Sequence, residues 1–301
     1  MVSLDDVSVF IAVVEAQNFS AAARELKISP SAVSKRINRL EYQLRAKLIN
    51  RSSRRISLSA AGSAFFEKCA GIRPIVEQAT RAVQSLHSAP GGKLRIHAST
   101  GLGIKLITPL VAQFMEEYAD LSVDLITHVH GPTVIAQGAD IILHQEEVLD
   151  KTLDHRELGD IHYAICASPD YLRRVGKPET PQDLPKHNCL VYAYETGQLA
   201  DRWEFKGKAG PCQVTVAGNF VSNNSAALQE AAVKGTGIAL LPVYAGLDDV
   251  KTGRLKVLFS DEVSFHRTLR AYYPRGPHQP INVRLFLDFI TKHIKGYTFG
   301  T

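Results

Sequence analysis

Apolar residues recur at helical spacing in the stretch that begins at Ser29. Four of them are separated by four, three and four positions and so share one face of an α-helix: Val33, Ile37, Leu40 and Leu44. Pro30 suits the first turn, where no N–H is needed, and Ser29 is a good cap before it. The opposite face carries hydroxyls first and cations later: Ser31, Ser34, Lys35, Asn38 and Arg39. Such a helix can enter a major groove of DNA, although an ordinary solvated helix has the same pattern.

Two further helices are predicted upstream. The nearer one runs from Asn18 to Leu26, with Asn18 or Ser20 as its cap and three alanines that allow close helix packing. Only Lys27 and Ile28 separate it from the next helix, which is the spacing of a helix-turn-helix. Residues 4–16 predict the first helix, with a core stripe of Leu4, Val7, Phe10, Ile11 and Val14.

The segment after these helices and the charge of the whole head favour a DNA-binding module. Residues 51–58 predict a two-stranded wing in which Ile56 and Leu58 alternate inward. Residues 1–58 contain ten Lys and Arg against five Asp and Glu, so this head carries the entire formal charge of +5. A basic head on a neutral remainder is typical of a domain that binds phosphates.

These N-terminal positions also carry a family likeness. The chain resembles the LysR-type transcriptional regulators, at fixed spacing, over Leu4, Phe10, Val13, Phe19, Ser20, Ala21, Ala22, Leu26, Ser29, Ser31, Ala32, Ser34, Ile37, Leu40, Glu41, Leu44, Leu48, Arg51, Leu58, Ala61 and Gly62. The resemblance implies a winged helix-turn-helix domain in residues 1–59 that binds double-stranded promoter DNA. Together with the geometry of the major groove, the resemblance assigns contacts with base edges to Pro30, Ser31, Ser34 and Lys35. It assigns contacts with phosphates to Ser20, Arg36, Arg39, Arg51, Arg54 and Arg55.

Residues 60–88 are predicted to form one long helix. Its apolar positions approach a heptad seam: Phe65, Ile72, Val76, Ala79, Val83 and Leu86. A seam on a helix between two domains favours contact with another chain, and in the family this helix pairs two heads, which implies a homodimer or homotetramer. An interior proline removes a backbone hydrogen bond, so Pro74 predicts a kink or a break near residues 70–74.

Beyond a flexible joint at residues 88–92, strands alternate with helices. Strands are predicted at 94–98, 123–130, 139–143, 160–168, 218–221 and 237–241, and helices at 107–118, 229–234 and 283–294. This alternation predicts a parallel sheet with ligands at the carboxyl ends of its strands.

The family resemblance continues through this half, in Leu153, Arg156, Leu158 and Gly159, in Ala167 to Leu172, in Thr180 to Leu184, in Gly235 to Pro242 and in Val283 to Phe289. It implies an effector-binding domain of two α/β lobes of periplasmic-binding-protein type, crossed twice by the chain. The expected class is thus α/β multidomain, with an effector domain at 89–301, lobe I at about 92–163 and 265–301, and lobe II at about 164–264.

The effector is expected between the lobes. Ser99, Thr100 and Gly101 end a strand and open a helix, where hydroxyls and unpaired N–H groups favour an anion. The other candidates follow strand ends: His128, His144, Ser222, Asn223 and Asn224. This lining suggests a small acidic metabolite, although Ser99 could only cap its helix and residues 222–224 could only form a turn. The family often has arginine near position 144, so His144 could make binding pH-dependent.

Composition and the remaining motifs weigh against other classes of protein. The 45% apolar and 22% charged residues are those of a soluble globular protein. Residues 1–6 lack a signal-peptide layout, no stretch is long enough to span a membrane, and four scattered cysteines indicate a reduced, cytoplasmic protein. His128 and His130 could bind a metal, but no acidic or cysteine cluster completes the site, so no cofactor is expected.

Two further alternatives are an enzyme and a free-standing solute-binding protein. Ser99 with His97 or His128 would be the catalytic pair, but the chain has no nucleophile elbow, phosphate loop or dinucleotide fingerprint. A solute-binding protein would explain the lobes and leave the basic head unexplained. The sequence therefore favours a regulator that could also contact RNA polymerase. Ligand binding without DNA affinity would favour the solute-binding protein.

Overall fold

The computed structural model describes residues 2–51, 56–85, 90–127, 138–194, 196–206, 210–260, 262–263, 265–276 and 279–294. The chain divides into an N-terminal unit that ends at Thr80 and a C-terminal unit that begins at Arg81. In the described part of the chain, no helix has both the length and the apolar character needed to cross a membrane.

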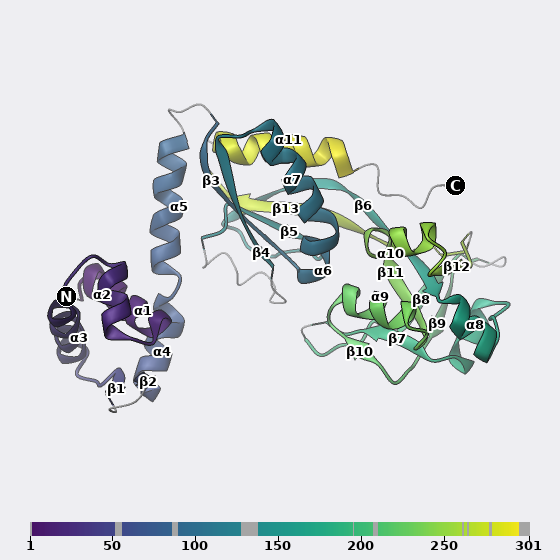
Figure 1. The fold of residues 1–301 in the computed structure, drawn as a ribbon, viewed down its shortest axis with the longest axis horizontal. Coiled ribbons are helices and arrows are strands. Elements are labelled where there is room, and N and C mark those ends of the chain that lie inside the picture. Colours follow the sequence, from purple (N-terminus) through teal and green to yellow (C-terminus); the bar gives the residue numbers. More distant parts are fainter. Residues whose placement is uncertain are drawn as a thin grey trace. The chain divides into compact units, whose positions relative to one another are not determined.

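The N-terminal unit contains the three predicted helices and the wing (Figure 1). The helices are α1 (Leu4–Ala16), α2 (Phe19–Glu25) and α3 (Pro30–Leu44), and the wing is an antiparallel pair of β1 (Ile49–Arg51) and β2 (Ile56–Leu58). The apolar faces of α1 and α3 meet in a core that includes Phe10, Ile11, Val33, Ile37 and Leu40. One position of the predicted α1 stripe is wrong, because Leu4 is 63% exposed. It is the first residue of α1, and the buried face begins only at Asp6 and Val7.

Two helices, α4 (Ala60–Cys69) and α5 (Ile72–Ser85), replace the single long helix that the sequence predicts. The expected break near Pro74 is confirmed, and it falls at residues 70–71. Pro74 is the third residue of α5, where its missing N–H has no intrahelical acceptor to lose. Half-buried Phe65 and Ile72 pack against the core of their own unit, so the predicted seam is wrong at these two positions. From Val76 onward the seam stays a prediction, and its last residue, Leu86, lies outside the described residues. There, Val76 and Val83 are 56% and 61% exposed.

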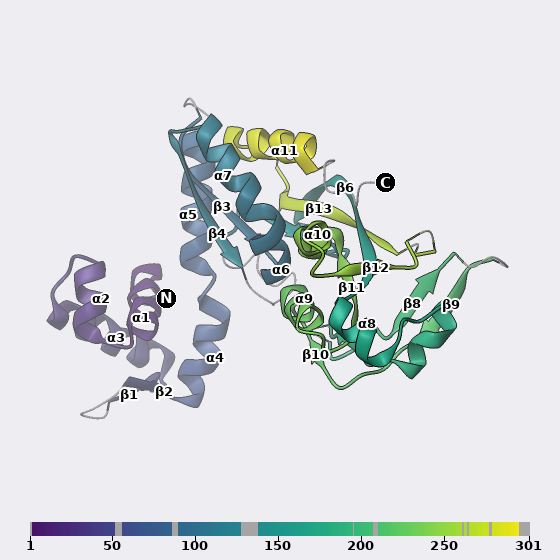
Figure 2. The same cartoon turned by 45° about the vertical axis from the view of Figure 1, so that its right-hand side comes forward.

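The C-terminal unit has two lobes joined by two long strands, β6 (Leu153–Ala167) and β13 (His266–Pro274) (Figure 2). One lobe contains β3 (Gly92–Ala98), α6 (Thr100–Leu102), a π-helical turn (Gly103–Ile107), α7 (Thr108–Glu117), β4 (Leu121–Thr127), β5 (Ile141–His144) and α11 (Ile281–His293). The other contains α8 (Pro169–Val175), a 3-10 helix (Pro181–Lys186), β7 (Cys189–Tyr192), β8 (Arg202–Phe205), β9 (Cys212–Thr215), β10 (Val221–Ser222), α9 (Ser225–Val233), β11 (Ile238–Pro242), α10 (Val243–Lys251) and β12 (Lys256–Leu258).

The main sheet is mixed, so the expectation of a parallel sheet is wrong. Its strands follow the order β10-β7-β11-β6-β13-β5-β3-β4. At one end of this order β10, β7 and β11 run parallel, and at the other end β5, β3 and β4 do. In the middle, β6 and β13 run antiparallel to each other and to their outer neighbours, β11 and β5. β6 pairs with β13 up to His162 and with β11 from Tyr163 onward. β6 therefore changes its partner where the chain passes between the lobes, which requires no crossover helix.

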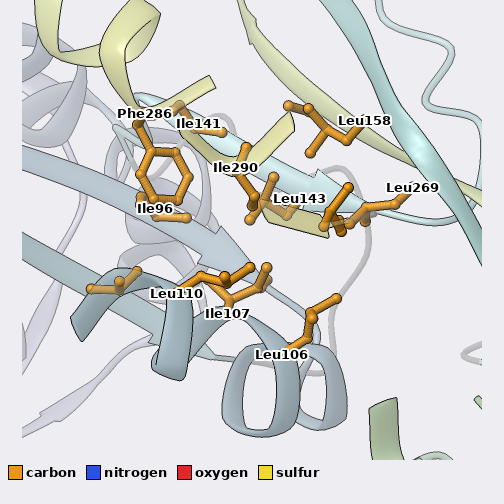
Figure 3. Packing of buried hydrophobic residues seen from close by; sticks show 14 of the residues in the cluster. Ile96, Leu106, Ile107, Leu110, Ile141, Leu143, Leu158, Leu269, Phe286 and Ile290 are labelled. Carbon is orange, nitrogen blue, oxygen red and sulfur yellow. The ribbon is translucent and has the colours of Figure 1, made fainter. Parts of the chain in front are cut away.

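The first lobe has a dense apolar core between its sheet and its helices. Figure 3 shows Ile96 and Leu143 of the sheet near Leu110 of α7 and Ile290 of α11. The Phe114 ring of α7 meets the Phe286 ring of α11 edge-on, at 5.2 Å between centroids. This core fixes the carboxyl ends of β3 and β5, from which Ser99 and His144 project.

Candidate DNA-binding and effector sites

Side-chain caps fix where α3 and its neighbour α2 begin. The Ser29 hydroxyl accepts a hydrogen bond from Ala32 N at 3.2 Å, and the Asn18 side chain accepts from Ser20 N at 2.8 Å. Asn18, rather than Ser20, is therefore the cap of α2. Opposite the buried face of α3, Ser31 and Lys35 are exposed and Ser34 is half-buried. This face is narrow at its start and carries a cation one turn further on, as a groove-reading helix requires.

Two arginines of α3 are already engaged with carboxylates of α1. Arg39 donates to the fully buried Asp6 through both Nε, at 2.5 Å, and Nη2. Arg36 lies 3.2 Å from an Asp5 oxygen. These pairs hold α3 against the first turn of α1, and they neutralise cations that the sequence assigns to phosphate contacts.

A buried glutamate attaches the wing to α3. Glu41 is 4% exposed, and its carboxylate accepts from Leu48 N at 2.9 Å, Ile49 N at 3.2 Å and Lys47 Nζ at 2.8 Å. Burial raises the pKa of this carboxyl, but the three donors outweigh burial, and the net pKa is lowered. Of the predicted wing cations, Arg51 ends β1, while Arg54 and Arg55 lie outside the described residues.

A cavity of about 630 Å³ lies in the C-terminal unit, between its lobes. From the first lobe it is lined by Ser99, Thr100, Gly101 and His144, and from the second by Asn223 and Ser225. A Cβ on Gly101 would collide with Ser225 Oγ, so glycine is what lets α6 approach α9 this closely. The volume of the cavity is in the range of small-molecule sites, about 300–1,000 Å³.

Some of the predicted effector residues are hydrogen-bonded to backbone N–H groups of the protein itself. Asn224 caps α9 by accepting from Ala226 N at 3.0 Å, and Ser222 Oγ accepts from Asn224 N at 3.2 Å. Of residues 222–224, only Asn223 lines the cavity. His144 lines it too, while its Nδ1 accepts from Glu146 N at 3.1 Å. His128 and His130 lie outside the described residues.

The sequence interpretation missed the aromatic side chains of the cavity. They come from both connecting strands and from the second lobe: Tyr163, Tyr192, Tyr194, Trp203, Tyr244 and Phe265. Arg267, at the start of β13, donates from Nη2 to Tyr194 Oη at 2.5 Å. Burial raises the pKa of Tyr163 well above its ordinary value, and the pKa of Tyr244 likewise, so both phenols are neutral at physiological pH.

Both units match known domain families. Residues 4–63 match the bacterial regulatory helix-turn-helix protein, lysR family, and residues 87–295 match the LysR substrate binding domain. The chain belongs to the LysR family. It is a DNA-binding transcriptional regulator with a substrate-binding domain, as the resemblance of its two halves predicts.

Relatives of this LysR regulator align with it over nearly its whole length. The HTH-type transcriptional activator AaeR of Escherichia coli is 31% identical over 97% of this chain and 94% of its own. The full-length structure of the Vibrio cholerae virulence activator AphB covers 98% of this chain and 100% of that one, with 26% identity and a TM-score of 0.66. CrgA of Neisseria meningitidis covers 96% and 98%, with 28% identity and a TM-score of 0.62. These neighbours support the predicted fold class of a helix-turn-helix head and a two-lobed effector domain.

Proposed function

We propose that this regulator inserts the first turns of α3 into the major groove of a pseudo-palindromic promoter site, in the cytoplasm, as a homo-oligomer. The observation that carries the proposal is the two-sided character of α3. One side is buried in the core, and the other presents the residues proposed for base reading: Pro30, Ser31, Ser34 and Lys35. Small side chains at the start permit close approach, and Lys35 can reach guanine edges.

Phosphate contacts are proposed for Ser20 at the start of α2 and for Arg51, Arg54 and Arg55 of the wing. For Arg36 and Arg39 the ion pairs favour a different role. Each is neutralised by a carboxylate of α1, and Asp6 is buried, so releasing Arg39 to a phosphate would leave a buried charge without its partner. We therefore assign Arg36 and Arg39 to the positioning of α3.

Pairing of two heads is proposed to use α5. Its exposed apolar side chains follow helical spacing along one stripe: Ile75, Val76, Ala79 and Val83. Exposed valine and isoleucine on one stripe favour a second copy of the helix as a partner.

The cavity is proposed to bind a small anionic effector. Arg267 is half-buried, and within the described ranges no carboxylate lies within ion-pairing distance of it. Ser99 and Thr100 add hydroxyl donors. Three carboxylates also line the cavity: Glu146 and Glu204 are exposed, where water screens them, and Asp201 is half-buried. An effector that contacts the two lobes differently would shift their arrangement and so couple to DNA binding.

The DNA proposal is tested with operator fragments, obtained by sequencing the genomic DNA that the purified protein retains. Arg54→Ala should weaken binding to all duplexes and reduce the salt slope by about one phosphate per head. Ser34→Ala should mainly relax sequence preference, and Arg173→Ala, an exposed arginine of α8, is the control. If Arg54→Ala left both the affinity and the salt slope unchanged, the wing assignment would be wrong.

The effector proposal is tested on the same operator. Ser99→Ala and Thr100→Val should abolish the change in footprint that cell metabolites produce, while operator affinity without metabolites stays at the wild-type value. An unaltered response in both variants would exclude these residues from the effector site.

A further inference from the structure

Aromatic side chains line the cavity from the second lobe to the connecting strands, and Tyr192, Tyr194, Tyr163 and Phe265 are here called the aromatic belt. In the second lobe, the rings of Tyr192 and Tyr194 meet edge-on at 5.6 Å between centroids. At the connecting strands, the rings of Tyr163 and Phe265 meet edge-on at 4.9 Å. Tyr163 Oη then donates to Gln145 Oε1, which follows β5 of the first lobe, at 2.9 Å.

Arg267 links the two halves of this belt. Its guanidinium carbon lies 5.4 Å from the centroid of the Tyr194 ring and 5.3 Å from that of the Phe265 ring. One donor is used by Tyr194 Oη, at 2.5 Å, and a guanidinium has five N–H donors. Arg267 therefore keeps donors for a further acceptor beside the rings of Tyr194 and Phe265.

We propose that the effector of this protein is an aromatic carboxylate, whose planar ring lies against the belt while its acid group pairs with Arg267. This inference rests on the effector role proposed above for the same cavity. Ring faces and edges attract another aromatic ring beyond what burial alone provides, and a guanidinium suits the two oxygens of a carboxylate.

The same surroundings disfavour two other ligand classes. A quaternary ammonium ion suits aromatic rings, but Arg267 already places a positive charge against two of them and would repel it. A short aliphatic diacid would pair with Arg267 but would offer no ring to the Tyr163–Phe265 and Tyr192–Tyr194 pairs. Burial raises the pKa of Tyr163 and of Tyr244, so these two phenols add no negative charge that would oppose an acid.

The test is calorimetric titration of the full-length protein with matched acids. Benzoate and cinnamate are compared with their saturated counterparts, cyclohexanecarboxylate and cyclohexylpropionate, and with benzyltrimethylammonium. The aromatic acids should bind about two- to tenfold more tightly than the saturated ones. Trp203, the only tryptophan of the chain, is 2% exposed and lines the cavity, so its fluorescence should change on binding there.

Two variants separate the ring contact from the charge contact. Phe265→Leu should remove most of the preference for aromatic over saturated acids. Arg267→Gln should weaken both kinds of acid about tenfold to a hundredfold and keep the ring preference. Arg270→Gln is the matched control, because Arg270 lies on the same strand but bonds to Glu157 at 2.9 Å, outside the cavity lining.

The outcomes distinguish this inference from the effector role itself. Equal or tighter binding of the saturated acids would overturn the aromatic class and leave the anionic effector site in place. Tighter binding of benzyltrimethylammonium, or an Arg267→Gln variant with wild-type affinity, would overturn the pairing with Arg267. If none of the acids binds, the aromatic class is wrong, and the response of the Ser99 and Thr100 variants on operator DNA decides the effector role separately.

Discussion

Replacing Glu41 by alanine should loosen the wing without removing the recognition helix. The change leaves Leu48 N and Ile49 N, both in buried residues, without the oxygen that accepts from them at 2.9 and 3.2 Å. An orphaned buried N–H costs about 1–3 kcal/mol, so the loss of both bonds should cost about 2–6 kcal/mol. The bond to Lys47 adds little, because Lys47 is exposed.

Hydrogen exchange followed by mass spectrometry measures this effect in the full-length protein. At 1.4 kcal/mol per factor of ten, amides 48 and 49 should exchange roughly 30- to 20,000-fold faster in Glu41→Ala. The control is Glu25→Ala, which removes a half-exposed ion pair with Arg73 and should change exchange less than about fivefold. Wild-type exchange at both amides in Glu41→Ala would refute the reasoning.

The same bonds give the effect a defined pH dependence. The folded state lowers the pKa of Glu41 below its ordinary value of 4.5. The unfolded chain therefore binds the proton more tightly, and the stabilisation is fully present above that value and is lost as pH falls through the folded pKa. The difference in exchange between wild type and Glu41→Ala should accordingly shrink in acid, and a constant difference would contradict the assignment.

Two further predictions concern the C-terminal end of α3 and the exposed stripe of α5. Arg45 follows α3 in a left-handed conformation with φ of 51°, so Arg45→Gly should stabilise the N-terminal unit by about 1 kcal/mol, and a lower melting temperature in calorimetry would contradict this. Val76→Asp places a charge on the exposed stripe of α5 and should lower the mass in sedimentation equilibrium at constant helix content. An unchanged mass would remove α5 from the pairing contact.

The N-terminal unit was predictable because its signals are local. The caps Asn18 and Ser29 lie within three residues of the amides that they accept from, and the apolar spacing of α3 is complete within fifteen residues. The long helix over residues 60–88 was predicted too simply. Its apolar spacing continues through residues 70–71, and only Pro74 indicated the break.

The aromatic belt could not be predicted in the same way. The rule that ligands lie beyond strand ends pointed to Ser99, Thr100 and His144 of the cavity lining, because each lies at or just beyond the end of a strand. Tyr163 and Phe265 are about a hundred residues apart, and they meet only because β6 and β13 pair antiparallel. No strand was predicted over residues 266–274, so nothing in the sequence interpretation brought Arg267 to the cavity. Tyr192 and Tyr194, two residues apart at the end of β7, were the available signal.

The position of the belt also explains how a ligand could act on the two lobes together. A ligand shifts an equilibrium only through contacts that differ between its two states. Tyr163 is the residue at which β6 exchanges β13 for β11 as its partner, and Tyr163 N donates to Phe265 O across the two strands at 3.1 Å. A ring held against this pair touches the backbone segments through which any change in the angle between the lobes must pass. Ser99 and Tyr194 lie on opposite lobes of the same cavity, so a ligand that reaches both has contacts that closure would strengthen.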